Sequence, residues 1–177
     1  MKTVLKKLLI IAVISVLSLT AVLLCACNNN NTHTEKHIVI SSDVTRIEAG
    51  AYKDYKNLET IFIPKSVKSV GANVFVGCEN LTIYAEEDES IAEWDIKWNS
   101  TSRPAIFGCK FTDSGDLYFI KSIHNPFTYD EDIISNPYRE GYEFDGWYTT
   151  DDFSGEKYDD IKSAPNGTLY SKWIKNN

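Results

Sequence analysis

The chain has 177 residues, a formal net charge of −7 and 43% hydrophobic residues, a length that fits one domain or two small ones. This composition excludes a disordered or collagen-like chain, and the acidic balance disfavours nucleic acid as the main partner. Residues 1–26 hold three lysines and no acid, so the rest carries 15 basic and 25 acidic residues, a net charge of −10. The part after residue 26 is therefore more acidic than the total suggests.

The N-terminal residues have the pattern of an export signal. Three lysines precede an apolar stretch over residues 8–24, as in a secretory signal peptide. The stretch ends in the letters LCAC at residues 24–27, which resemble the lipobox of bacterial lipoproteins. The resemblance implies a signal peptide over residues 1–26 and a diacylglycerol anchor on Cys27, which would hold the protein on the extracellular face of a bacterial cell membrane. An uncleaved transmembrane anchor is the alternative, because this apolar stretch is near the lower limit for spanning a bilayer.

Residues 27–37 predict a flexible spacer. They begin with Cys27 and four asparagines and have no apolar periodicity, a composition typical of linkers. His33 and His37 are four residues apart, a spacing that would place two imidazoles on one helix face for a metal. Nothing in this stretch favours a helix and no third ligand is nearby, so we predict solvated histidines and no metal site.

Residues 38–108 contain an internal repeat with an offset of 23 residues. The aligned pairs are Ile38 with Ile61, Ile40 with Ile63, Val44 with Val67, Ile47 with Val70, and Tyr52 with Phe75. A short alternating strand in each unit of this length is typical of leucine-rich repeats. The run from Ile63 to Leu81 resembles the BspA-type leucine-rich repeat, in which Cys78 would be a small buried residue. The resemblance implies a short solenoid of roughly two repeats, fewer than the three that such folds normally need.

The residues after the repeats predict a cap for the solenoid. Residues 90–93 match a capping box, and a helix over residues 90–98 would place Trp94 and Trp98 on one apolar face. A last strand is expected at residues 104–107. We favour core packing for the two tryptophans; a platform for stacking on carbohydrate is the alternative.

Residues 109–177 differ from the repeats in their many aromatic residues and glycine-containing turns. Residues 110–120 predict a hairpin. Residues 136–149 (NPYREGYEFDGWYT) and 167–173 (GTLYSKW) resemble the Listeria–Bacteroides repeat, also called the internalin B-repeat. The resemblance implies a small β-grasp-like domain whose aromatic residues, including Trp147, mostly form a core.

The two cysteines beyond the signal, Cys78 and Cys109, leave a disulfide open. An exported chain can pair them, but their separation does not follow from the sequence. The acidic run at residues 86–89 lacks the ligand spacing of a calcium loop. We therefore predict no metal site there.

Together these patterns predict a mainly β protein with minor helix: a leucine-rich-repeat solenoid with a capping helix, then a β-grasp-like domain. No catalytic motif and no cofactor site is evident. By family analogy we expect a non-enzymatic surface lipoprotein of the adhesin type that binds a host or neighbouring-cell surface protein. The alternatives are a structural cell-envelope spacer, or a carbohydrate-binding accessory using exposed Trp94, Trp98 or Trp147. The sequence leaves the oligomeric state and the ligand open.

Overall fold

The computed structural model describes residues 33–87, 93–111, 117–120 and 134–177, and residues 33–177 form one compact unit. The described residues form strands, turns and one short 3-10 helix, η1 (Ile161–Ser163). This confirms the mainly β prediction. None of the helical structure in these ranges has the length and hydrophobicity of a membrane span.

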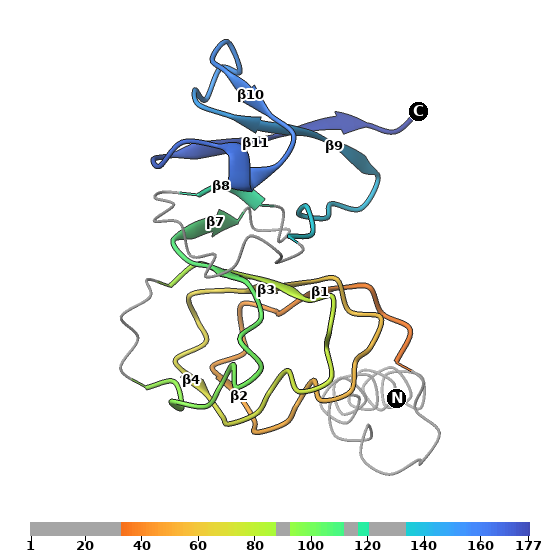
Figure 1. Ribbon diagram of the computed structural model, residues 1–177, viewed down its shortest axis with the longest axis vertical. Helices are drawn as coiled ribbons and strands as arrows, with labels where there is room; N and C mark the ends of the chain where they lie inside the picture. The colour runs from red at the N-terminus through yellow and green to blue at the C-terminus, as the bar shows by residue number, and fades with distance from the viewer. Residues whose placement is uncertain (1–32, 88–92, 112–116, 121–133) are drawn as a thin grey trace, which may run out of the picture. The chain divides into compact units, whose positions relative to one another are not determined.

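The first sheet is formed by one strand from each coil of a solenoid (Figure 1). Its four parallel strands, in spatial order, are β1 (His37–Val39), β3 (Thr60–Ile63), β5 (Thr82–Ala85) and β6 (Ala105–Ile106). The register pairs Ile38 with Ile61, and Ile61 with Ile83. The predicted repeat is thus confirmed, and the predicted strand at residues 104–107 is the fourth rung, β6. A second, smaller parallel sheet joins β2 (Arg46–Ile47) to β4 (Ser69–Val70).

The predicted capping helix over residues 90–98 is wrong for residues 93–98, which form turns and a β-bridge. Trp94 bridges Val70 in parallel and so extends the smaller sheet by one rung. The segment continues the solenoid as a third coil. Trp94 and Trp98 pack against the apolar interior of the coils from this turn-rich backbone, so no helix is needed to bury them. Residues 88–92, with the predicted N-cap, lie outside the described residues.

Alternation along the strands divides their side chains between two cores. In β3, Ile61 and Ile63 point into the coils, where they belong to the first core with Leu58, Val67 and other apolar residues. The intervening Phe62 points out of the coils and belongs to the second core. Successive side chains of a strand face opposite sides, so the rungs β3, β5 and β6 each contribute to both cores.

The second sheet is antiparallel in all its described pairs. Its five strands, in spatial order, are β10 (Lys157–Tyr158), β9 (Tyr142–Tyr148), β11 (Leu169–Lys175), β8 (Leu117–Ile120) and β7 (Cys109–Phe111). The predicted hairpin at residues 110–120 is confirmed as β7 and β8. The C-terminal strand β11 lies between two hairpins and pairs with both (Figure 1). The β-grasp part of the prediction is not confirmed by these pairings.

A β-bulge at Gly146 sets the direction of the aromatic side chains of β9. The register shifts between Lys172 and Trp173 on the partner strand, and Gly146 has φ +152°. A Cβ at this position would lie 3.1 Å from the Tyr158 carbonyl oxygen, and this positive φ strains any residue other than glycine. The bulge brings Phe144 and Trp147 together, with ring centroids 5.2 Å apart.

The second core joins the two sheets. Its buried residues from the solenoid are Phe62, Tyr84 and Ile106, and those from the second sheet and the turn before β11 are Cys109, Trp147, Ile161 and Leu169. The outward face of the solenoid sheet is therefore covered at β3, β5 and β6. Burial of these side chains stabilises both parts at once.

Candidate functional site

The three tryptophans proposed as a ligand surface do not share a surface. Trp147 is 0% exposed and lies in the second core, so it is excluded from ligand contact. Trp94 and Trp98 are half-buried against the first core, with ring centroids 4.8 Å apart in an edge-on pair. Trp147 is a core residue, so the alternative that it forms part of a carbohydrate-binding platform is wrong.

The two thiols are structural. Cys78 and Cys109 are free and buried in different cores, so no disulfide joins them. Cys78 Sγ lies 3.0 Å from the Tyr52 carbonyl, and Cys109 Sγ lies 3.2 Å from the Ile106 carbonyl. Burial raises the pKa of both thiols, which keeps them protonated and unreactive. Cys27, the predicted lipidation site, lies outside the described residues.

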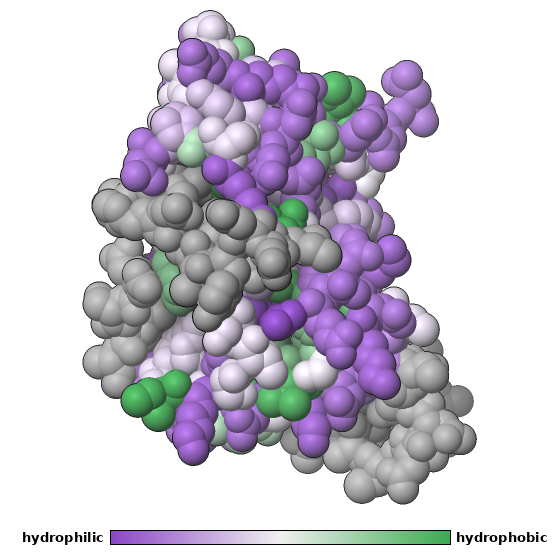
Figure 2. All heavy atoms as spheres, viewed as in Figure 1, coloured by the Kyte–Doolittle hydropathy of each residue, from purple (hydrophilic) through white to green (hydrophobic). Residues whose placement is uncertain are grey.

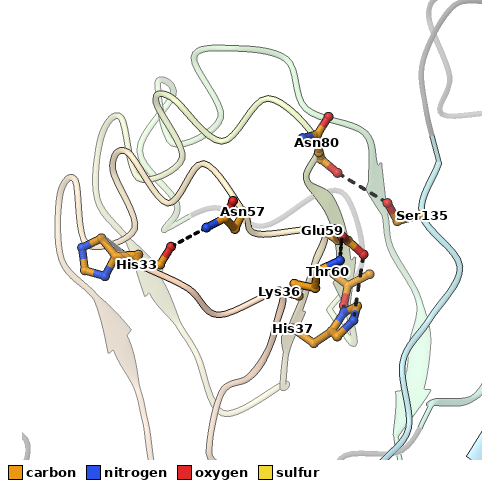
Figure 3. Close-up of polar contacts among 8 residues, drawn as sticks. All are labelled: His33, Lys36, His37, Asn57, Glu59, Thr60, Asn80 and Ser135. Atoms are coloured by element: carbon orange, nitrogen blue, oxygen red, sulfur yellow. Dashed lines mark hydrogen bonds and ion pairs between the residues drawn. The ribbon is translucent and has the colours of Figure 1, made fainter. Parts of the chain in front are cut away.

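The last residues of the predicted spacer are held on the first coil of the solenoid (Figure 3). The His33 ring stacks on Tyr55 at 3.5 Å between centroids and 12° between planes. The Asn57 side-chain amide donates to the His33 carbonyl at 2.9 Å. Lys36 Nζ lies 2.7 Å from Glu59 Oε1. From His33 onward the chain is therefore part of the folded unit.

His37 lies in an arrangement that resembles a catalytic triad but lacks its accessibility. His37 Nδ1 and Thr60 Oγ1 are 2.9 Å apart, and His37 Nε2 is 4.0 Å from Glu59 Oε2 (Figure 3). A nucleophilic hydroxyl must reach the substrate, whereas Thr60 is 0% exposed. The contacts hold the first two rungs together and offer no site for acyl transfer.

Acidification should weaken the fold through His37. Burial lowers the pKa of His37 below its ordinary value of 6.5, while Glu59 opposes this shift and Lys36 adds to it. The unfolded chain then binds the proton at higher pH than the folded chain, so stability is present above 6.5 and falls as the pH drops below it. We expect the melting temperature to fall more in wild type than in His37→Gln between about pH 7.5 and about pH 5.5. Equal falls, measured by circular dichroism, would contradict this role.

A segment of the C-terminal half, Ser135 and the residues that follow it (here called the strap), is hydrogen-bonded to the beginning of β5, an interior strand of the solenoid sheet. The Ser135 amide donates to Thr82 Oγ1 at 2.9 Å, and the Tyr84 hydroxyl donates to the Ser135 carbonyl at 2.7 Å. The Ser135 hydroxyl donates to the Asn80 carbonyl at 3.4 Å (Figure 3). These bonds join residues more than 50 positions apart, so they fix the path of the residues that follow Ser135.

Tyr138, three residues after Ser135 on the strap, lies at the surface. The Tyr138 ring stacks on the His37 ring at 4.1 Å and 3° and stays 41% exposed. Next to it, the Arg139 guanidinium lies 3.7 Å from the centre of the Tyr142 ring. Val39, two residues after His37 on the same face of β1, is 48% exposed. We call these exposed or half-buried residues (Val39, Tyr138, Arg139 and Tyr142) the Tyr138 patch.

On the face drawn in Figure 2, hydrophilic residues dominate the described surface and hydrophobic residues form small separate spots. Tyrosine and arginine are the residue types most enriched where proteins bind other proteins. The sequence letters PYREGY contain three of the four residues of this patch, but only the stacking on His37, about 100 positions earlier in the chain, shows where the Tyr138 ring is held.

Asp145 is the centre of a separate polar cluster on the second sheet. Its carboxylate accepts from the Tyr148 hydroxyl at 2.6 Å and lies 3.3 Å from both Lys157 Nζ and Lys172 Nζ. The hydrogen bond from Tyr148 is the main cause that lowers the pKa of Asp145. The three donors come from three different strands, so the cluster connects β9, β10 and β11.

The acidic run at residues 86–89 contributes to the contact between coils. The Lys65 backbone amide donates to Glu86 at 2.9 Å, and Glu87 lies 3.4 Å from Lys68 Nζ. The other two residues of the run lie outside the described residues. Within the described ranges, no three His, Cys, Asp or Glu side chains are placed to hold a metal ion.

Comparison with known families matches two parts of the chain. Residues 27–96 match the family model of the BspA type leucine rich repeat region (6 copies), and residues 110–172 match the Listeria-Bacteroides repeat domain. Both families, and their order, are those that the sequence motifs predicted. No curated protein and no solved structure gives a significant match.

Proposed function

We propose that this chain, in which a BspA-type leucine-rich repeat region precedes a Listeria–Bacteroides repeat, is a non-enzymatic, lipid-anchored protein that binds another protein outside a bacterial cell. Both repeat types are typical of bacterial surface proteins. The lipobox-like sequence before Cys27 supports the anchor. The partner we propose is a surface protein of a host or of a neighbouring cell.

The observation that carries this proposal is the rigid seat of the Tyr138 patch. Solenoids offer extended surfaces for binding, but the outward sheet face is covered here at β3, β5 and β6 by the second core. Tyr138 is held by the His37 stack yet remains 41% exposed. A side chain already fixed in one conformation loses little entropy on binding, and such aromatic anchors carry much of the affinity of protein interfaces.

The experiment compares two alanine variants of the soluble exported part, residues 27–177 with Cys27→Ser. The wild type is incubated with purified host matrix proteins, bacterial surface extracts and cell-wall glycan, and retained proteins are identified by mass spectrometry. Against each retained protein, Tyr138→Ala should weaken binding by roughly tenfold, about 1.4 kcal/mol. Ile174→Ala, which truncates a 50% exposed residue outside the patch, should bind like wild type.

Each other outcome favours an alternative. Retention of glycan alone would indicate the carbohydrate-binding accessory, with Trp94 or Trp98 as its remaining aromatic candidates. Retention of nothing would indicate a structural spacer of the cell envelope. Equal weakening by Tyr138→Ala and Ile174→Ala would contradict the patch as the binding surface.

A further inference from the structure

The N-terminal end of the solenoid core is open among the described residues. There, β1 pairs only with β3. Four interior positions are half-buried in the first coil but at most 1% exposed in the second; the pairs are Ile38 and Ile61, Val44 and Val67, Tyr52 and Phe75, and Tyr55 and Cys78. The end of the first coil is thus a partly apolar surface with two half-buried tyrosines, of which Tyr55 is stacked against the His33 ring.

The anchor point lies very close to this open end. Because His33 is fixed on Tyr55 and Asn57, only the five residues 28–32 separate Cys27 from the folded unit. Fully extended, such a leash spans about 20 Å. A lipidated Cys27 would lie at the membrane interface, so His33 and the first coil would be confined to within this distance of the headgroups.

The charge distribution suits the same orientation. The first coil, residues 33–59, has four basic and five acidic residues, whereas residues 60–177 have eleven basic and twenty acidic residues. An anionic leaflet repels the more acidic part. Tyrosine side chains, with an apolar ring and a polar hydroxyl, favour the headgroup level, and Tyr52 and Tyr55 lie at this end.

We infer that the open end of the first coil is a membrane-facing surface, which rests on the lipid headgroups. The inference rests on the lipid anchor of the proposed function. It adds a fixed orientation and a surface for that orientation: the end formed by Ile38, Val44, Tyr52 and Tyr55.

The test uses the full lipidated protein in vesicles. Exposed Lys53 in the first coil and exposed Asp151 between β9 and β10 are replaced singly by cysteine and labelled with a fluorophore. Wild type measures background labelling of buried Cys78 and Cys109. The vesicles contain phosphatidylcholine and phosphatidylglycerol with a minor share of lipid carrying a nitroxide on its headgroup. We expect loss of fluorescence from the Lys53→Cys label and none from the Asp151→Cys label.

Two controls separate the anchor from the orientation. Mass spectrometry must find diacylglycerol on Cys27, and Cys27→Ser must be absent from the membrane fraction; failure of either overturns the lipid anchor itself. If the anchor is present but both labels are quenched equally, or the Asp151→Cys label more strongly, the orientation is overturned. A long glycine–serine insertion after Asn31 should restore fluorescence at Lys53→Cys, and persistent quenching would show that the short leash is not its cause.

Discussion

Replacing Trp147 with alanine should lower the free energy of unfolding of the exported part by about 3–5 kcal/mol, the usual cost of truncating a large buried aromatic residue. Trp147 is 0% exposed and packs with Phe62 and Tyr84 of the solenoid in the second core. Its loss would leave a cavity between the two sheets. Because domains of this size have only about 5–15 kcal/mol in total, the variant should lose a large fraction of its stability.

The measurement is urea unfolding followed by two probes, far-ultraviolet circular dichroism and tryptophan fluorescence. If the second core couples the two parts, both probes should shift together to lower urea. Ile174→Ala is the matched control, because Ile174 lies on β11 but is 50% exposed, and it should change stability by no more than about 0.5 kcal/mol. A Trp147→Ala variant that unfolds in two steps, with the solenoid unaffected, would show that the solenoid does not depend on the shared core.

The repeat and the two families followed from the sequence because they are local patterns. Equivalent residues such as Ile61 and Ile83 recur at a nearly fixed spacing, and a coil that cannot bury its apolar side chains alone must stack on the next. The motif with Gly146 and Trp147 was equally specific, since the bulge needs a glycine at one position. Patterns of this kind involve residues close together in the chain, so they can be recognised from the sequence alone.

The shared core did not follow from the sequence because no local pattern encodes it. Phe62 and Tyr84 alternate with inward-facing isoleucines, which indicates only that they point away from the first core. What covers them depends on a segment tens of residues later. The third coil was mistaken for a helix for a similar reason: Trp94 and Trp98 are four residues apart, a spacing that fits a helix face and also fits two interior positions of a turn-rich coil.

The candidate site was missed because its rigidity comes from contacts between distant segments. Tyr138 stands in a turn-like sequence between Pro137 and Gly141, and its fixed position depends on the stack with His37. Conversely, the tryptophans attracted attention by residue type alone, although large aromatic residues in small domains are more often used to fill cores.

Replacing Gly71 with alanine should cost about 3 kcal/mol, near the upper end of what overpacking usually costs, because the added methyl group meets the backbone of the neighbouring coil. A Cβ at Gly71 would lie 2.7 Å from Ala49 Cα and 3.0 Å from the Glu48 carbonyl carbon. The Gly71 amide donates to the Ile47 carbonyl at 2.9 Å, so the two coils cannot separate without breaking this ladder. The atoms that the methyl group meets belong to the backbone of Glu48 and Ala49, which cannot relieve the contact by changing a side-chain rotamer.

The same unfolding assay measures this effect, with Glu48→Ala as the matched control. Glu48 occupies the equivalent position of the first coil, next to Ile47 as Gly71 is next to Val70, and its exposed pair with Arg46 at 2.8 Å is worth little. The control should therefore differ from wild type by no more than about 0.5 kcal/mol. If Gly71→Ala is as stable as the control, the coils are not in the close contact described, and the stacking of the first coil on the second must be looser at this position.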